Sequence, residues 1–340
     1  MSAILTGFLF ILLAAVAGGA FGLQYRVMRV YKVENTSLLS MFCATVPIPL
    51  IACWLLLPGW TQAIARAGLA ANAVVFVFGF CWGLGAITYA YGFNLLGMAL
   101  AASLLKGISI AIGSGVPLLR HWERIAPPAR VAVIAGLGAL IVGTAFAGMA
   151  GIERERELEG GRKAGGRIFW IGFTMCVLSG VISAGANLGY DRADVIEEAM
   201  TTIAGRDLAW RATLVRWMPM YWGGITALII FMGGAMILNG TWRNYFARRS
   251  GRDFAISSSM GGVHFLAQIP YGVGAYYLGK LGTTVGWGLN IGMALIVATS
   301  IGFLQGEWKG ASRRALHYLQ GAIVILVGAI VLLSYANSLA

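Results

Sequence analysis

Two titratable side chains, Lys106 and His264, occur inside long apolar stretches of this 340-residue sequence. Lys106 has no Asp or Glu within two helical turns on either side. A lysine at the centre of a membrane helix costs about 2.5–3.5 kcal/mol to insert, so it must face a polar cavity, lose its charge or find a partner. An imidazole titrates near physiological pH, so His264 is a candidate for proton coupling. Lys106 is a candidate for substrate binding or proton coupling. The structural alternatives are a lysine capped by carbonyl groups of a broken helix and a neutral packing histidine.

Uncharged polar and aromatic side chains in the same apolar stretches are suited to binding a sugar. Amides hydrogen-bond hydroxyl groups well, and aromatic rings line most small-molecule sites. The candidate amides are Gln24, Asn187, Gln268 and Asn290, and the candidate rings are Trp82, Tyr89, Tyr271, Tyr276 and Trp287. The alternative for each amide is a hydrogen bond that holds two membrane helices together.

No motif for nucleotide, metal or covalent chemistry accompanies these residues. The sequence has no GxxxxGK[ST] loop, HExxH pair or nucleophile elbow, so we expect neither an enzyme nor a cofactor. The four cysteines lie in apolar runs without CxxC spacing, which indicates neither a disulfide framework nor a zinc site. The net charge of +12 comes from basic residues in short loops between apolar runs, which is typical of topology signals and not of nucleic-acid binding.

The composition places these residues in a lipid bilayer. Hydrophobic residues make up 59% of the chain and charged residues only 11%, whereas soluble domains carry about 25% charged residues. A helical span needs about 20 apolar residues, and continuous apolar runs exclude a membrane β-barrel. We predict an all-α polytopic membrane protein with ten transmembrane helices. The predicted spans are 4–23, 36–57, 73–93, 96–119, 130–150, 168–190, 212–238, 258–278, 283–305 and 316–338.

A charged linker at 151–167 divides the chain into two halves of five spans, 1–150 and 168–340. The halves share six identities in nineteen positions at an offset of 182 residues, and this offset aligns Trp82 with His264. Because each half has an odd number of spans, the second half begins on the opposite side of the membrane from the first. We therefore predict two inverted five-helix repeats, with Trp82 and His264 beside their pseudo-twofold axis. Inverted repeats around a midplane site are typical of secondary transporters. We expect a central cavity lined by spans 1, 3, 4, 6, 8 and 9.

Lys and Arg counts predict the orientation. The loops after the odd-numbered spans carry fifteen of these residues and the other side carries eight, so the linker should be cytoplasmic and both termini periplasmic. The second polar stretch, about 191–211, is predicted to form a short amphipathic helix. Pro117 and Pro270 are expected to break the helical ladder where it lines the cavity.

Several motifs resemble the bacterial L-rhamnose–proton symporter family. The most specific is Phe78-Gly-Phe-Cys-Trp-Gly-Leu-Gly85, followed by Tyr89 and Leu96-Gly-Met98. Ser183-Ala-Gly185 and Glu307-Trp308, with Arg313-Arg314 after it, are weaker matches. The resemblance implies membership of the drug/metabolite transporter superfamily. It also implies ten helices in two inverted five-helix repeats and proton-coupled uptake of a deoxyhexose.

The chain departs from that family's pattern at site positions. Lys106 stands where an apolar residue is expected, Asn290 where a histidine is expected, and residues 279–287 lack acidic and tyrosine-rich character. We expect proton-coupled uptake of L-rhamnose across a bacterial inner membrane, with a sugar, protons and the lipid bilayer as partners. A sugar acid or other small metabolite with Lys106 as anion partner is the alternative within transport. A non-transporting membrane sensor or scaffold is the alternative of another class.

Overall fold

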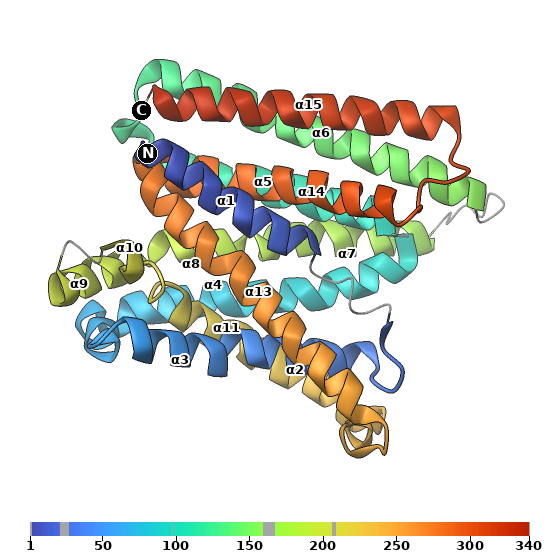
Figure 1. The fold of residues 1–340 in the computed structure, drawn as a ribbon, viewed down its shortest axis with the longest axis horizontal. Helices are drawn as coiled ribbons and strands as arrows, with labels where there is room; N and C mark the ends of the chain where they lie inside the picture. Colours follow the sequence, from blue (N-terminus) through green and yellow to red (C-terminus); the bar gives the residue numbers. More distant parts are fainter. Residues whose placement is uncertain (1, 21–26, 97, 159–166, 206–208, 340) are drawn as a thin grey trace.

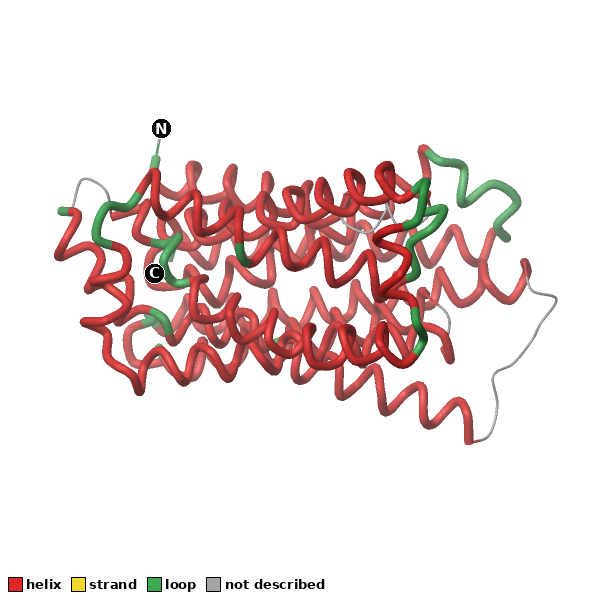
Figure 2. The backbone as a smooth tube through the Cα atoms, turned by 90° about the horizontal axis from the view of Figure 1, so that it is seen from below, coloured by secondary structure: helices red, strands yellow, loops and turns green. Residues whose placement is uncertain are grey.

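The computed structural model is a bundle of long helices that run side by side (Figures 1 and 2). It describes residues 2–20, 27–96, 98–158, 167–205 and 209–339, without the side chains of residues 89–94, 96, 98–99 and 155–158. The described residues contain no β-strand, which confirms the all-α prediction for that part of the chain.

Fifteen α-helices and four shorter helical segments follow one another in these described ranges. The α-helices are α1 (Ala3–Ala20), α2 (Val33–Thr45), α3 (Pro47–Leu56), α4 (Trp60–Leu96), α5 (Met98–Arg120), α6 (Pro127–Leu158), α7 (Arg167–Ser183), α8 (Gly185–Arg192), α9 (Asp194–Ala204), α10 (Ala209–Ala212), α11 (Trp217–Leu228), α12 (Gly234–Leu238), α13 (Ser250–Leu278), α14 (Gly282–Leu304) and α15 (Arg313–Ser338). The shorter segments are η2 (Trp122–Arg124), η4 (Ile229–Gly233), η5 (Thr241–Phe246) and η6 (Gly279–Leu281), of which η4 is a π-helix and the others are 3-10 helices.

Nine helical segments of the described chain are long and apolar enough to cross a membrane. Eight of them correspond one to one to predicted spans. The ninth is the 55-residue stretch Ser250–Leu304, which contains two predicted spans. Within it, α13 ends at Leu278, and Gly279 takes the positive φ of 68° before α14 begins at Gly282.

Helix breaks occur at places other than the two predicted prolines. Pro117 and Pro270 lie inside α5 and α13, which continue through them, so the expectation of a broken backbone at these residues is wrong. The chain breaks instead between α2 and α3, before Pro47, and between α7 and α8, at Ala184. A proline is favoured in the first helical turn, where its missing N–H is not needed, which explains the start of α3.

The long helices pack in a defined order across the bundle. Figure 1 shows α6 beside α15 along one edge and α2, α3 and α11 toward the opposite edge, with α1, α4, α5, α7, α13 and α14 between them. Glycines allow close backbone contacts between these helices, and two of them occupy aligned positions in the two halves. A Cβ atom at Gly79 would lie 2.0 Å from the carbonyl oxygen of Met220, and one at Gly261 would lie 2.5 Å from that of Ser40. These glycines therefore let α4 approach α11 and α13 approach α2.

The bundle has two distinct ends. Both termini lie at one end, which we call the terminal end (Figure 1). The short helix α9 lies at this end and buries Ile196 and Met200, which confirms the predicted amphipathic helix. The opposite end, where α6 ends and α7 begins, is the linker end.

Polar contacts at the linker end fasten the segment before α2 to the start of α13. The buried Asp253 carboxylate accepts hydrogen bonds of 2.6 to 3.0 Å from the backbone N–H groups of Arg29, Val30 and Tyr31. Burial raises the pKa of the nearby Tyr245 hydroxyl to about 12, so this hydroxyl stays protonated and donates a 2.9 Å hydrogen bond to the carbonyl oxygen of Asn35.

Candidate functional site

Polar residues recur along one face of each of four central helices. Residues spaced by three, four or seven positions share a helix face. On α13 these are His264, Gln268 and Tyr271; on α14, Thr283, Trp287 and Asn290; on α5, Lys106 and Ser109, with Gly113 on the same face; and on α8, Asn187 and Asp191. Contacts between the four faces divide them into three levels along the bundle.

The level nearest the terminal end is a charged cluster centred on Asp191, which we call the outer cluster (Arg120, His121, Asp191 and Thr283). Asp191 is 4% exposed. Its Oδ1 atom lies 3.0 Å from Nε2 of His121 and accepts a 2.6 Å hydrogen bond from the hydroxyl of Thr283. Its Oδ2 atom accepts a 2.6 Å hydrogen bond from Arg120, which also donates to Asp194. The outer cluster thus joins the ends of α5 and α8 to the start of α14.

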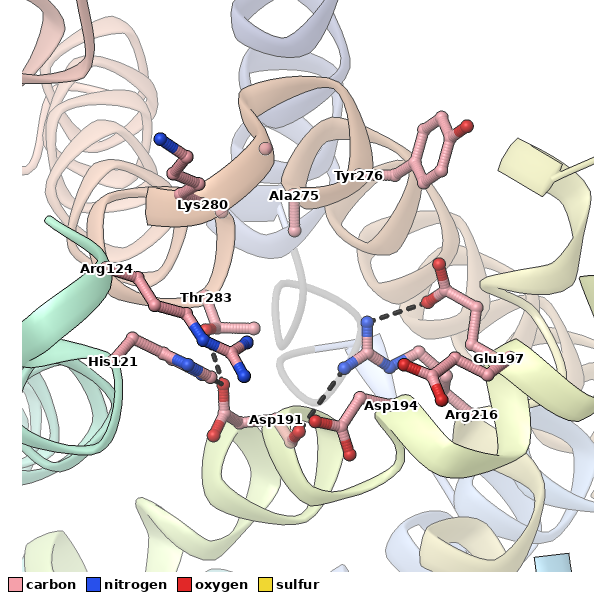
Figure 3. Close-up of a pocket in the computed structure, with 13 residues that line it drawn as sticks. His121, Arg124, Asp191, Asp194, Glu197, Arg216, Ala275, Tyr276, Lys280 and Thr283 are labelled. Carbon is pink, nitrogen blue, oxygen red and sulfur yellow. Dashed lines mark hydrogen bonds and ion pairs between the residues drawn. The ribbon is translucent and has the colours of Figure 1, made fainter. Parts of the chain in front are cut away.

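A pocket of about 250 Å³ opens beside the outer cluster (Figure 3). Asp191 and Thr283 form part of its wall, and Arg216 lies across from them. Arg216 donates a 2.7 Å hydrogen bond to Glu197 and packs over the ring of Tyr190 at 4.2 Å. Arg216 and Glu197, two of the charges that line the pocket, are therefore paired with each other.

The middle level is an aromatic layer (Tyr190, Trp217, Tyr271 and Trp287). All four side chains are at most 7% exposed, and neighbouring ring centroids lie 4.6 to 6.0 Å apart. Asn187 is buried at the same level, where it accepts a hydrogen bond from the Tyr271 hydroxyl. Its Nδ2 atom donates to the carbonyl oxygens of Gly113 and Thr283, at 2.6 and 2.8 Å. The layer therefore separates the pocket from the interior of the bundle.

The aromatic layer depends on a glycine for its fit against α5. The indole Nε1 of Trp287 donates a 3.2 Å hydrogen bond to the carbonyl oxygen of Ser109. A Cβ atom at Gly113 would lie 2.5 Å from the same indole nitrogen. Only a residue without a side chain allows the ring to lie flat on α5 at this position.

The level nearest the linker end contains five of the predicted site residues, which we call the chamber residues (Trp82, Lys106, His264, Gln268 and Asn290). The rings of Trp82 and His264 stack with centroids 5.7 Å apart. The amide oxygens of Gln268 and Asn290 have no hydrogen-bond partner within the described ranges. Lys106, which lies one turn before Ser109 on α5, is partly exposed and forms no ion pair with any described residue. These groups can donate and accept hydrogen bonds to a polar ligand.

The structure brings most of the predicted site residues together on the four central helices and α4. Asn187, Tyr271 and Trp287 are in direct contact, but they form the closed layer and not an open pocket. Tyr276 is 38% exposed and lines the pocket at the terminal end. Gln24 lies outside the described residues. Tyr89 belongs to α4, but its side chain lies outside the description.

Sequence reasoning missed the outer cluster. Asp191 was assigned to a polar stretch after the sixth span, and Arg120 and His121 to the end of the fourth. The spacing of Asp191 four residues after Asn187 was the available signal, because it puts both on one face of the helix. Nothing in the sequence indicated that Thr283 would face that carboxylate.

A bundle of apolar helices that encloses a line of polar side chains defines a multi-pass membrane transport protein. The sequence model of the L-rhamnose-proton symport protein (RhaT) family matches residues 1–337, and the chain belongs to this family. The family consists of symporters, which are transporters and not enzymes.

Curated relatives span almost the whole chain. An L-rhamnose-proton symporter of Yersinia pestis bv. Antiqua (strain Antiqua) is 24% identical, covering 96% of this chain and 97% of its own length. The L-rhamnose-proton symporter of Cronobacter sakazakii is 26% identical, covering 96% of both chains. That of Yersinia pseudotuberculosis serotype O:1b is 24% identical over a similar share. No solved structure matches the chain significantly.

Proposed function

We propose that this protein carries out proton-coupled uptake of L-rhamnose, or a related deoxyhexose, across a bacterial inner membrane. The observation that carries this proposal is the match of the family model over residues 1–337. The relatives named as L-rhamnose-proton symporters align over 96% of the chain, so the match includes every helix that contributes to the candidate site.

The proposed architecture has ten spans, with 1–150 and 168–340 as inverted repeats joined by the cytoplasmic linker 151–167. An even number of crossings is supported by the two termini, which lie at the same end of the bundle (Figure 1). The 29 residues of α13 and the 23 of α14 are each long enough to cross a hydrocarbon core of about 30 Å at 1.5 Å per residue. The stretch Ser250–Leu304 therefore accounts for two spans.

Equivalent contacts in the two halves support the inverted repeat. In the proposed repeats, α1 corresponds to α7, α4 to α13, and α5 to α14. The contact of α1 with α13 then corresponds to the contact of α7 with α4. The contact of α1 with α14 likewise corresponds to the contact of α7 with α5. All four of these contacts are present in the structure. Gly79 and Gly261, aligned at the offset of 182, make the same kind of backbone approach to a neighbouring helix. This is the arrangement expected of the drug/metabolite transporter superfamily.

The chamber residues are the proposed contacts of the sugar. The unpartnered amide oxygens of Gln268 and Asn290 can accept hydrogen bonds from hydroxyl groups, and the Trp82 ring can pack on an apolar sugar face. Asn187, Tyr271 and Trp287 bound the chamber on its terminal side and complete the proposed site. Gln24 and Tyr89 remain proposed contacts from the sequence. His264 is the proposed proton carrier, with Lys106 as the second titratable group.

A sugar acid is the second candidate substrate, because Lys106 lacks an ionic partner among the described residues. A lysine that stays charged in a low-dielectric site favours an anion over a neutral sugar. The neutral sugar remains the first choice, since the curated relatives share that substrate in their names.

The test is uptake by the purified protein in proteoliposomes. An imposed inward proton gradient should drive accumulation of labelled L-rhamnose, and an uncoupler should abolish it. The aldonic acid of the same sugar, supplied under identical conditions, measures the second candidate. If neither compound enters faster than into protein-free liposomes, the transport proposal fails and a sensor or scaffold takes its place.

A further inference from the structure

We propose that Asp191 is a positioning residue of the transport cycle, whose carboxylate holds the terminal end of the pathway closed. This inference rests on the proposed transport function, because a closed end has meaning only for a path through the bundle. The structure is accordingly a conformation closed at the terminal end.

The hydrogen bonds of Asp191 reach helices from both proposed repeats. Arg120 is the last residue of α5 and His121 follows it, in the first repeat, and Thr283 comes from the start of α14, in the second. Each partner lies within 3.0 Å of a carboxylate oxygen. A charge that is 4% exposed is stable only while such partners surround it. The carboxylate therefore stabilises the state in which the ends of α5, α8 and α14 are together.

The outer cluster is connected directly to the aromatic layer beneath it. Thr283 donates to Asp191 through its hydroxyl and accepts from Asn187 through its backbone carbonyl. Asn187 in turn accepts the hydrogen bond of Tyr271. Separation of α8 from α14 would break the contacts at both levels together, so the cluster and the layer open as one unit.

Burial along the central helices changes at this layer. Every residue of α14 from Gly282 to Leu289 is buried, whereas from Asn290 to Ser300 only Gly292 is buried. In α13, Pro270 to Ala275 are all buried, and in α5, residues 102–108 are all partly exposed. On α13 and α14 the segment toward the terminal end is therefore closely packed, and on α5 and α14 the segment toward the linker end is less buried.

Two other acids near the cluster have arginine partners, and one of these arginines is the Arg120 that also binds Asp191. Asp194 accepts from Arg120, and Arg216 pairs with Glu197. Glu198 lines the same pocket and is exposed, and no ion pair joins it to the described residues. This difference provides a matched control, because Glu198→Gln removes one negative charge from the pocket and leaves the cluster intact.

The experiment measures access to the chamber from each side of the membrane, without substrate. Cys43, Cys53, Cys81 and Cys176 are replaced in the full chain, and Asn290→Cys is introduced as reporter. A membrane-impermeant thiosulfonate is applied to right-side-out and inside-out vesicles. We expect the parent to react from the linker side only. Asp191→Asn should raise the rate from the terminal side by about tenfold or more, the scale of losing a charged hydrogen bond.

Two further variants make the outcome decisive. Thr283→Val, which removes one donor to Asp191 with little change in shape, should raise the terminal-side rate in the same direction even if Asp191→Asn does not fold. Glu198→Gln should leave both rates unchanged. Three results would each overturn the proposal. The first is equal labelling of the parent from both sides, and the second is an unchanged terminal-side rate in folded Asp191→Asn and Thr283→Val. The third is an equal rise of that rate in Glu198→Gln. Because no sugar is present, these results do not depend on whether L-rhamnose is the substrate.

Discussion

The indole ring of Trp82 stacks on the imidazole ring of His264, with centroids 5.7 Å apart and an angle of 23° between the planes. These residues are also aligned when the two halves of the sequence are compared at an offset of 182. In an inverted repeat, two equivalent residues contact each other only if the pseudo-twofold axis that relates the repeats passes between them. The contact therefore supports a site shared by both halves, with a tryptophan from one and a titratable histidine from the other.

His264→Gln should uncouple sugar movement from the proton gradient. Glutamine keeps a hydrogen-bonding side chain at this position but cannot titrate in the physiological range. We expect accumulation of L-rhamnose against its gradient to fail in proteoliposomes, while exchange of labelled for unlabelled sugar continues. Exchange thus serves as the internal control for folding. Full accumulation by the variant would assign the proton to Lys106 or to an acid such as Asp191.

Lys106→Met separates the two candidate substrates. If L-rhamnose binds, the variant loses one charged hydrogen bond, which costs about 1.5–3 kcal/mol and weakens binding roughly 10- to 150-fold. If a sugar acid binds, the variant loses the proposed partner of the substrate carboxylate, and binding should be abolished. Calorimetric titration of the parent and the variant with both compounds measures this difference. Unchanged L-rhamnose affinity in the variant would remove Lys106 from the site.

Gly79→Ala and Gly261→Ala should each destabilise the protein. The added methyl group would meet the backbone of α11 in the first case and of α2 in the second, which must move apart. Overpacking of this kind typically costs about 1–3 kcal/mol. Gly262→Ala is the matched control, because no atom lies within 4 Å of the place that its methyl group would take. Thermal unfolding in detergent should show a lower midpoint for the first two variants only; an equal midpoint for all three would contradict the close packing.

Tyr271→Phe should weaken the aromatic layer. The variant keeps the ring but leaves the Asn187 Oδ1 atom without its donor in a fully buried place. A buried acceptor left without a partner costs about 1–3 kcal/mol. We expect a lower unfolding midpoint, whereas Tyr276→Phe, at an exposed ring of the same helix, should leave it unchanged. A stable Tyr271→Phe protein would mean that water replaces the lost donor.

The orientation can be measured with two exposed positions at opposite ends. In a background without native cysteines, Arg192→Cys at the terminal end should react with an impermeant maleimide on intact cells. Arg248→Cys at the linker end should react only after permeabilisation. This pattern follows from the fifteen Lys and Arg residues in the predicted loops after the odd-numbered spans, against eight in the other loops. The reverse pattern would invert the predicted topology.

The sequence predicted the helices well because long apolar runs leave a membrane chain few alternatives. It also predicted the boundary between α13 and α14, because the spans 258–278 and 283–305 leave a gap where α13 ends at Leu278 and α14 begins at Gly282. It wrongly placed the broken backbone at Pro117 and Pro270, where the neighbouring helices tolerate the missing donor and the helix continues.

The candidate site was predicted in part. The sequence singles out Lys106, His264, Gln268 and Asn290 because a polar side chain inside an apolar membrane segment is a functional candidate. The sequence places Asp191 only among the acids at span ends, because an acid at the end of an apolar run resembles part of a solvated loop, and its buried pairing is not predicted. Its burial depends on Arg120, which is 71 residues away, and such pairing has no local signal in a single sequence.

The tight turn between α13 and α14 joins these two helices into a rigid helical hairpin. A Cβ atom at Gly282 would lie 2.0 Å from the carbonyl oxygen of Ala275, so the two arms are in backbone contact directly beside the turn. Tyr271 sits on one arm and Trp287 on the other, with ring centroids 5.5 Å apart. Any movement of this hairpin therefore displaces both rings together. The contact that opens in such a movement is the one between the hairpin and the helices that contain Asn187 and Gly113, α8 and α5.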